Sequence, residues 1–530
     1  MTDERPSPTI HPVIAWAVLV FASLGVFLGG AELMVVAIAL PSIVADFGGW
    51  ADLARASWIV NAYLLAYVVA MPLAGRAADL WGARRLYVLA LLLFSAGSLG
   101  AGLSRLAGPD AGMDWLIASR VVQGIGGGAL VPLSMALASH LFRGPSRAAA
   151  LGVEGAATFV GMAVGPAYGA WVLLNFNLPL PGVDLATWQW IFFLNVPAGI
   201  LTLLLIYVVA GGIETPRAPG GLDLAGALLV TVGLLAGVAA LTLAGARGWS
   251  DPLIVAGFAA SGACIGLFVW LELRRRFPLV DPRLFGDRSF AAANTVSLLT
   301  GYTLATAIIG GPVFVNRVLN GGADDSAAAL TALTLAIAAG AVLGGLVSVA
   351  VGERVTTVLG VAATVVALWL ARTGWGVETG LEVLVRDLAL FGGGFGLTVS
   401  PRATAAVEAA GASAYGVASA MLQITRTVGM SVGLALLTSI GQNRIDELTE
   451  LINDPLRRDQ LVIALGRREF VGVDPRASLA LVDLLEEWSR RQAAEVLQLV
   501  LTIALGVAVV TLLPALLVGA RDARRRPARR

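Results

Sequence analysis

The chain has 530 residues, of which 57% are hydrophobic and only 13% are charged, with a formal net charge of +1 and a mean hydropathy of +0.82. Soluble domains carry about 25% charged residues, so this composition excludes a soluble enzyme and indicates a protein that crosses a membrane many times. The balanced charge gives no sign of nucleic-acid binding, the single Cys264 excludes an internal disulfide, and two histidines are too few for a histidine-based metal site.

Helix-length apolar runs recur along the whole chain. Crossing a bilayer as a helix takes roughly 20 apolar residues, and we count about fourteen such runs, none with the alternating pattern of a barrel strand. Their limits are 13–40, 57–77, 86–106, 114–141, 148–174, 189–210, 222–245, 252–272, 290–316, 326–351, 355–372, 380–401, 412–441 and 493–519. The sequence therefore predicts an all-α polytopic membrane protein.

Arginine placement predicts the orientation. With the N-terminus inside, the segments on the cytoplasmic side hold about twenty arginines and the short outer loops about five. The opposite orientation would reverse this bias. We therefore expect both termini in the cytoplasm, and the protein in the cytoplasmic (inner) membrane of a bacterium.

The runs divide into six, two and six. The first six end near Arg217, and a charged stretch from Glu272 to Arg288 precedes the last six. The two runs between them are rich in small residues, which suits a lipid-facing linker pair. We predict an N-terminal six-helix bundle over 1–217, two linker helices over 218–273 and a C-terminal six-helix bundle over 274–530.

A faint internal repeat supports two related halves. Gly75 and Gly82 follow the second run, and Gly345 and Gly352 follow the corresponding run of the later half at the same spacing. Secondary transporters are commonly built from such repeats, with a site between them.

The segment between the second and third runs combines glycines with charges. Its candidate latch residues are Gly75, Arg76, Asp79, Gly82, Arg84 and Arg85. We interpret the segment as a tight cytoplasmic turn in which glycine lets neighbouring helices approach. Asp79 is expected to accept hydrogen bonds from a helix N-terminus in the other half while Arg84 balances its charge, which would hold the inner side shut. The alternative is a loop that only sets topology.

Four ionisable residues lie inside apolar runs: Glu32, Arg120, Glu154 and Arg426. An ionised side chain at mid-bilayer costs at least about 2.5 kcal/mol, so it needs a partner, a wet cavity or a function. A carboxylate that alternates between an apolar environment and an arginine can carry a proton. The alternative for Glu32 is a membrane-edge residue that reaches outward to water, and for Glu154 it is a plain pairing between helices.

Three further motifs lie within the runs. The fourth run carries Arg120, Gln123 and Gly124 in the stretch RVVQGIGGG. The sixth opens with WQWIFFLNVP at 188–197. The fifth holds small residues that allow close helix packing, with a proline that allows a kink: Gly161, Gly165, Pro166 and Gly169.

Together with the loop at 75–85, these motifs resemble the major facilitator superfamily over the whole chain. The number of runs and the sixth-run motif resemble its fourteen-helix drug:proton antiporter branch. Within that branch the chain is most similar to the mycobacterial triacylglyceride and multidrug exporters, through four stretches: WIVNAYLLAY (58–67), MPLAGR (71–76), NVP (195–197) and GVASA (416–420).

The resemblance implies a fold and a set of roles. The fold is two six-helix bundles plus two linker helices, and Glu32 takes the place of that group's proton-coupling acid, with Arg426 as its basic partner. A periplasmic lipid-binding lipoprotein is implied as a partner. The chain departs from the group at Phe159, where the group has an acid deep in the fifth helix, and near 374–380, where the group's long outer hairpin is short here.

A long outer segment, 442–492, separates the last two runs. Its flanks are amphipathic at helical spacing, through Ile445, Leu448, Leu451 and Ile452 on one side and Leu479, Val482, Leu485 and Trp488 on the other. We predict that the last two membrane helices continue outward for roughly 20 Å. The alternative is a solvated loop with one surface helix.

These expectations combine into a proton-coupled exporter of lipidic or amphiphilic molecules, such as triacylglycerides, that works by alternating access. The alternative is a polyspecific multidrug:proton antiporter. A lipid-modifying membrane enzyme is more remote, because the sequence holds no catalytic constellation and no phosphate loop. We expect protons, membrane lipids and an amphiphilic substrate as partners, a monomer, and no cofactor, metal or nucleic acid.

Overall fold

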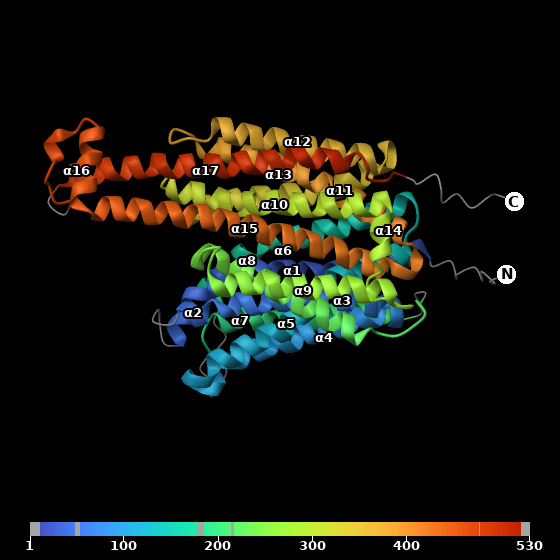
Figure 1. Ribbon diagram of the computed structural model, residues 1–530. Helices are drawn as coiled ribbons and strands as arrows, with labels where there is room; N and C mark the ends of the chain where they lie inside the picture. The colour runs from blue at the N-terminus through green and yellow to red at the C-terminus, as the bar shows by residue number, and fades with distance from the viewer. Residues whose placement is uncertain are drawn as a thin grey trace.

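The computed structural model describes residues 11–47, 53–176, 185–211, 213, 217–475 and 478–520 (Figure 1). Within these residues the secondary structure is helical, without strands. The described chain contains 14 helical segments long and apolar enough to cross a membrane. The predicted fold class is confirmed.

The N-terminal half contributes six of these segments. Its helices are α1 (Pro12–Asp46), the short α2 (Leu53–Ala56), α3 (Trp58–Trp81), α4 (Ala83–Leu103), α5 (Gly108–Leu141), α6 (Pro145–Asn175) and α7 (Gln189–Val209). Several begin with a proline in the first turn, among them α1, α5 and α6, where the missing N–H has no partner to lose.

Two linker helices and the C-terminal half follow. The linkers are α8 (Leu224–Arg247) and α9 (Pro252–Arg274), and the second half comprises α10 (Arg288–Arg317), α11 (Ala323–Val351), α12 (Glu353–Gly374), α13 (Leu381–Leu397), α14 (Val399–Ala410), α15 (Tyr415–Asn453), α16 (Pro455–Ala464) and α17 (Leu479–Ala515). The linkers pack on each other, and α8 also packs on α3 and α15. The domain limits at 217 and 273 stay a prediction.

Two local differences from the sequence-based expectation have simple causes. The turn expected over 75–85 is reduced to Gly82, because both flanking helices continue to it and its φ of 96° reverses the chain without side-chain strain. The twelfth span divides into α13 and α14 at Thr398. Pro401, four residues after Leu397, cannot donate to the carbonyl of that residue, so the helical bond is lost there.

Helix α1 begins and α17 ends at the same end of the bundle, here called the terminal end (Figure 1). At the opposite end α15 and α17 project beyond the other helices and carry α16 at their tip. The residues of α15 from 442 onward span roughly 18 Å. Side chains of residues 442, 443, 445–450 and 452 lie outside the described residues, including the predicted apolar positions Ile445, Leu448 and Ile452.

The halves meet through α6 with α11 and α14, and through α15 with α3 and α5. The glycine repeat lies at these contacts. A Cβ added to Gly75 would lie 2.5 Å from the carbonyl oxygen of Gly416, and one added to Gly345 would lie 2.6 Å from that of Ala148. Each glycine therefore lets its half touch the backbone of the other half.

Candidate functional site

Glu32 lies midway along α1 and forms a buried ion pair with Arg120 of α5. Arg120 Nη1 donates to Glu32 Oε1, and each side chain is 1% exposed. The predicted basic partner, Arg426, does not occupy this place. The reason is packing, because α1 lies against α5 whereas Arg426 belongs to α15 of the other half.

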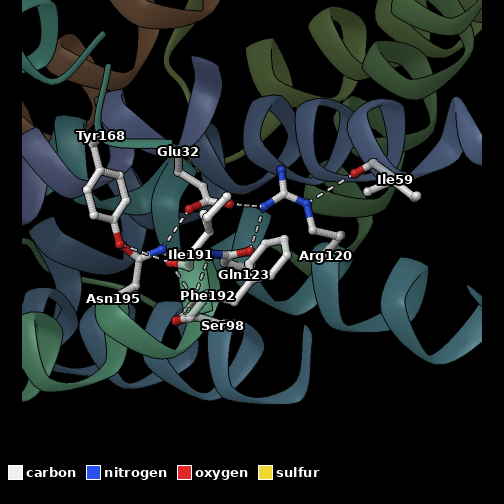
Figure 2. A network of polar contacts seen from close by, with 9 residues as sticks. All are labelled: Glu32, Ile59, Ser98, Arg120, Gln123, Tyr168, Ile191, Phe192 and Asn195. Carbon is white, nitrogen blue, oxygen red and sulfur yellow. Dashed lines mark hydrogen bonds and ion pairs between the residues drawn. The ribbon is translucent and has the colours of Figure 1, made fainter. Parts of the chain in front are cut away.

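A network of neutral polar groups surrounds the pair (Figure 2). Asn195 Nδ2 of α7 donates to Glu32 Oε2 at 2.7 Å, and Arg120 Nη1 donates to Gln123 Oε1 at 2.6 Å. Ser98 of α4 links both amides, since its hydroxyl accepts from Gln123 at 3.2 Å and from Asn195 at 3.3 Å. The carboxylate is thus held directly by groups from α5 and α7, and Ser98 of α4 holds the two amides in place.

Aromatic rings and a backbone carbonyl complete the surroundings of Arg120. Its guanidinium lies 4.2 Å from the ring centre of Tyr63 and 5.7 Å from that of Phe192, within the range of cation–π attraction. Its Nε donates to the carbonyl of Ile59 at 3.1 Å. Arg120 therefore stays anchored to α3 if Glu32 becomes protonated and the ion pair is lost.

Glu154 is a second buried acid of the same half. It is 2% exposed on α6, and its Oε1 accepts from Ser23 of α1 at 3.3 Å. Its Oε2 has no hydrogen-bond partner in the described part of the chain. The hydrogen bond from Ser23 joins α1 to α6, so Glu154 takes part in the pairing between helices that the sequence left open, with a neutral group as its partner.

Glycines on one face of α6 allow α1, which carries Glu32, to pack closely against it. A Cβ on Gly161 would collide with the carbonyl oxygen of Phe27, and one on Gly165 would lie 2.6 Å from that of Ala31. A Cβ on Gly169 would lie 2.7 Å from Cγ2 of the Val35 side chain. Because these positions repeat every four residues on both helices, the two backbones touch along a continuous stripe. Pro166 lies inside α6, which continues through it.

Gly124 has the same role between α5 and α3. A Cβ added there would lie 2.5 Å from the carbonyl oxygen of Tyr63. Close approach of these helices brings the Arg120 side chain within reach of Ile59 and Tyr63.

Asp79 joins the halves at the terminal end. Its carboxylate accepts from the backbone N–H of Gly416 at 2.8 Å and of Val417 at 3.0 Å, at the start of α15. This is the contact with a helix N-terminus that the sequence predicts. The remaining prediction for this segment, that Arg84 balances Asp79, is wrong in this structure. Arg84 instead donates to the carbonyls of Tyr207 and Gly211, both at 3.1 Å, and so caps the C-terminus of α7.

The other two arginines of the segment differ in exposure. Arg76 is buried, donates to the carbonyl of Pro219 at 3.4 Å and interacts electrostatically with Asp79. Arg85 is exposed. Arg76, rather than Arg84, is therefore the cation beside Asp79.

A profile described as Major Facilitator Superfamily matches residues 22–434. The chain belongs to the major facilitator superfamily. The family resemblance seen in the sequence is confirmed, and as a member of this superfamily the protein is a multi-pass membrane transporter and not an enzyme.

Relatives of this protein are named either as triacylglyceride transporters or as multidrug transporters. The triacylglyceride transporter of Mycolicibacterium hassiacum is 32% identical over 443 residues, which cover 80% of this chain and 79% of that protein. The multidrug transporter protein MdtP of Bacillus subtilis is 28% identical over 428 residues, covering 80% and 75%. The crystal structure of the human organic anion transporter MFSD10 aligns with a TM-score of 0.62 at 16% identity, covering 96% of this chain and 100% of that one. At that identity the likeness shows the fold alone.

Two features of this protein could not be recognised from its sequence. Ser98 carried no signal, because a serine in an apolar run is ordinary. Arg402 lies just past the predicted limit of its run at 401, yet α14 continues and buries it to 4% exposure. The adjacent Pro401 was the signal that the run divides rather than ends.

Gly165→Ala is expected to lower the melting temperature of the protein and to reduce transport. The new methyl group would meet the Ala31 carbonyl at 2.6 Å, a distance at which backbone must shift, and overpacking of this kind costs about 1–3 kcal/mol. Fluorescence-detected thermal melting measures the effect. Gly262→Ala on α9, where no atom lies within 4 Å, is the matched control and should melt no lower than wild type. Equal melting of both variants would contradict a tight α1–α6 stripe.

Proposed function

We propose that this protein is a proton-coupled exporter of lipidic or amphiphilic molecules that works by alternating access. The observation that carries the proposal is the buried pair of Glu32 and Arg120 with its neutral hydrogen-bonding network. A buried ion pair is costly and gives little stability by itself. Its presence in a transporter supports a functional reason, and reversible protonation of Glu32 is the simplest one.

In this mechanism Glu32 is the proton carrier and Arg120 its counter-ion. Protonation removes the negative charge, and Arg120 then retains Gln123, the Ile59 carbonyl and the Tyr63 ring. Glu154 is proposed as a second proton-binding group, because its Oε2 lacks a partner among the described residues. Arg426 is also proposed as a proton-coupling residue, because it is a cation of the opposite half, although it does not contact Glu32 in this structure.

Opening and closing of the terminal end is assigned to the segment from Gly75 to Arg85. The two bonds from α15 to Asp79, with the close approach of Gly75 and Gly416, join the halves at that end. We propose that these contacts break when the halves rock. We further propose that this end faces the cytoplasm of a bacterium, from the arginine bias, and that the protein acts as a monomer.

Lipid cargo is supported by the projecting helices and by the names of the relatives. Leu481 and Leu485 of α17 are buried against Val462 of α16, so part of the apolar surface packs on itself. Other apolar side chains at the tip remain exposed: Leu456, Ile463, Leu465, Val471, Leu479 and Val482. Exposed apolar surface costs roughly 25 cal/mol per Å², which favours a use such as shielding an acyl chain or receiving a lipid-binding lipoprotein. The name of MdtP supports the second candidate, a multidrug exporter.

Shortening the projection separates these two cargoes. In one variant, residues 445–491 are replaced by a short Gly/Ser turn. Arg444 and Gln492 stay, and because their side chains are hydrogen-bonded, the helices are near enough for such a turn. In vesicles with an imposed pH gradient, wild type is expected to move both a fluorescent triacylglyceride and a cationic dye. The shortened protein should lose triacylglyceride movement, by at least about tenfold, and keep dye movement.

Shortening also removes contacts to the α10–α11 loop, so a control isolates them. Arg490 Nε donates to the Val318 carbonyl at 2.7 Å, and Glu486 accepts from Asn320 at 2.7 Å. The variant Glu486→Ala/Arg490→Ala loses both contacts at full length and should transport lipid as wild type does. Normal lipid transport by the shortened protein would argue for the multidrug exporter.

A further inference from the structure

Two arginines of the C-terminal half, Arg402 on α14 and Arg426 on α15, lie near enough to act on each other electrostatically. Arg402 is 4% exposed, and the two guanidinium groups interact electrostatically. In the described part of the chain neither forms an ion pair with a carboxylate. Two like charges in a membrane-embedded position repel each other and are poorly solvated. A bound anion would therefore lower the electrostatic energy of this pair.

The contacts of Arg402 hold two of its nitrogens without neutralising its charge. Its Nε donates to the carbonyl of Thr398 at 2.8 Å, at the break between α13 and α14, and its Nη1 donates to the hydroxyl of Thr300 at 2.7 Å. Both acceptors are neutral. Arg402 is therefore fixed in place with its positive charge uncompensated.

Arg426 has still fewer partners. Its Nε is buried and has no hydrogen-bond partner among the described residues. A guanidinium presents donors in a planar fork that suits carboxylate and phosphate oxygens. An unused donor on this group is the chemical feature that an oxyanion would satisfy.

Two phenylalanine rings connect the arginines. Arg402 lies 5.5 Å from the ring centre of Phe395, Arg426 lies 5.7 Å from that of Phe159, and the two rings meet edge to face at 5.8 Å. Phe159 belongs to α6 of the N-terminal half, so the arginines lie at the boundary between the halves.

Buried acids of the two halves have other partners. Glu32 is paired with Arg120, and Asp387 is paired with Arg386 at 2.8 Å and accepts from Trp375. Glu154 accepts from Ser23 of its own half. The negative charge that the two arginines require is therefore not supplied by these side chains.

The apolar surroundings indicate what kind of anion fits. Phe159 and Met162 of α6 pack in one cluster with Tyr302 of α10, and Met34 and Met430 lie against it. Methionine side chains adapt to flexible apolar ligands. A pair of cations beside such a surface matches a molecule with a charged head and a hydrocarbon chain.

We propose that Arg402 and Arg426 bind the oxyanion headgroup, a carboxylate or a phosphate, of an amphiphilic cargo whose chain lies along this apolar cluster. The inference rests on the proposed exporter function for the fate of the cargo, but binding itself requires no proton gradient. It adds anionic amphiphiles to the substrates of the proposed exporter and predicts that they bind more tightly than uncharged analogues of the same chain length.

Binding to the purified full-length protein in detergent tests the proposal. The probes are a pyrene-labelled fatty acid, its uncharged methyl ester and a pyrene-labelled alkyl phosphate. Wild type is expected to bind the acid or the phosphate at least about tenfold more tightly than the ester. Preference for the phosphate identifies a phosphate headgroup, and preference for the acid identifies a carboxylate. Equal affinity for all three probes overturns the proposal.

Variants of Arg426 locate the effect. Arg426→Gln should reduce the ratio of anion to ester affinity to about one and leave ester affinity unchanged, whereas Arg426→Lys should keep a several-fold preference. Arg402→Lys replaces the second cation without removing its charge and should also keep a preference. Arg247→Gln at the exposed end of α8 is the control. A folded Arg426→Gln protein that still prefers the anions overturns the proposal.

The binding proposal and the exporter proposal can fail independently of each other. Anion-selective binding without proton-driven transport would support this site and contradict the exporter. Proton-driven movement of triacylglyceride by a protein that binds acid and ester equally would contradict this site alone.

Discussion

Glu32→Gln is expected to abolish proton-driven transport while substrate exchange without a gradient continues. If one proton is exchanged per substrate molecule, a pH difference of one unit can maintain up to about a tenfold substrate gradient, since it supplies about 1.4 kcal/mol. The amide cannot release a proton in this range, so the variant should reach a substrate ratio of one. Proteoliposomes with an imposed pH gradient measure this ratio directly.

The variant also leaves Arg120 buried without its counter-ion, which costs about 3–5 kcal/mol when one partner of a buried pair is removed. A second variant therefore separates coupling from folding. Glu32→Gln/Arg120→Gln removes both charges and should melt at a higher temperature than the single variant, yet remain uncoupled. Glu32→Asp keeps a titratable group and should keep partial coupling. A substrate gradient equal to that of wild type in Glu32→Gln would show that Glu32 does not carry the proton.

Asp79→Asn is expected to open the terminal end more often. The carboxylate accepts two backbone hydrogen bonds at the start of α15, at 2.8 and 3.0 Å, and hydrogen bonds to a charged group contribute about 1.5–3 kcal/mol. The neutral amide has one acceptor oxygen and no charge to interact with the helix N-terminus. The closed state should therefore lose roughly tenfold or more in population relative to the open state.

Labelling of a single cysteine measures this opening. In a Cys264→Ser background, Ser419→Cys places a thiol at a fully buried position of α15, a few residues beyond the Asp79 contact. Its reaction with a water-soluble maleimide should be about tenfold faster in Asp79→Asn, in proportion to the open population. Asp251→Asn is the matched control. Asp251 caps the N-terminus of α9 by accepting from the backbone N–H of Leu253 at 2.8 Å, and this contact does not connect the two halves. Unchanged labelling in Asp79→Asn with normal transport would leave the segment with a topological role only.

Much of the architecture follows from local sequence. The 14 spans were predictable because length and apolarity belong to each segment separately. Gly82 and Gly352 marked helix ends because both require positive φ, at 96° and 86°. The type of contact that Asp79 makes, a carboxylate that accepts from a helix N-terminus, was also predictable, since an acid in a short turn beside glycines has few other partners to bind.

The sequence alone also identified Glu32 and Arg120 as exceptional, because charge inside an apolar run is costly wherever the run packs. Only the tertiary structure decided that they are partners. They lie 88 residues apart, and Arg426 was an equally acceptable cation by composition. Which cation meets Glu32 depends on the faces that α1 and α5 present to each other, and these are set by contacts such as that of Gly165 with Ala31. Pairing across helices is a property of packing, and packing is not contained in any single span.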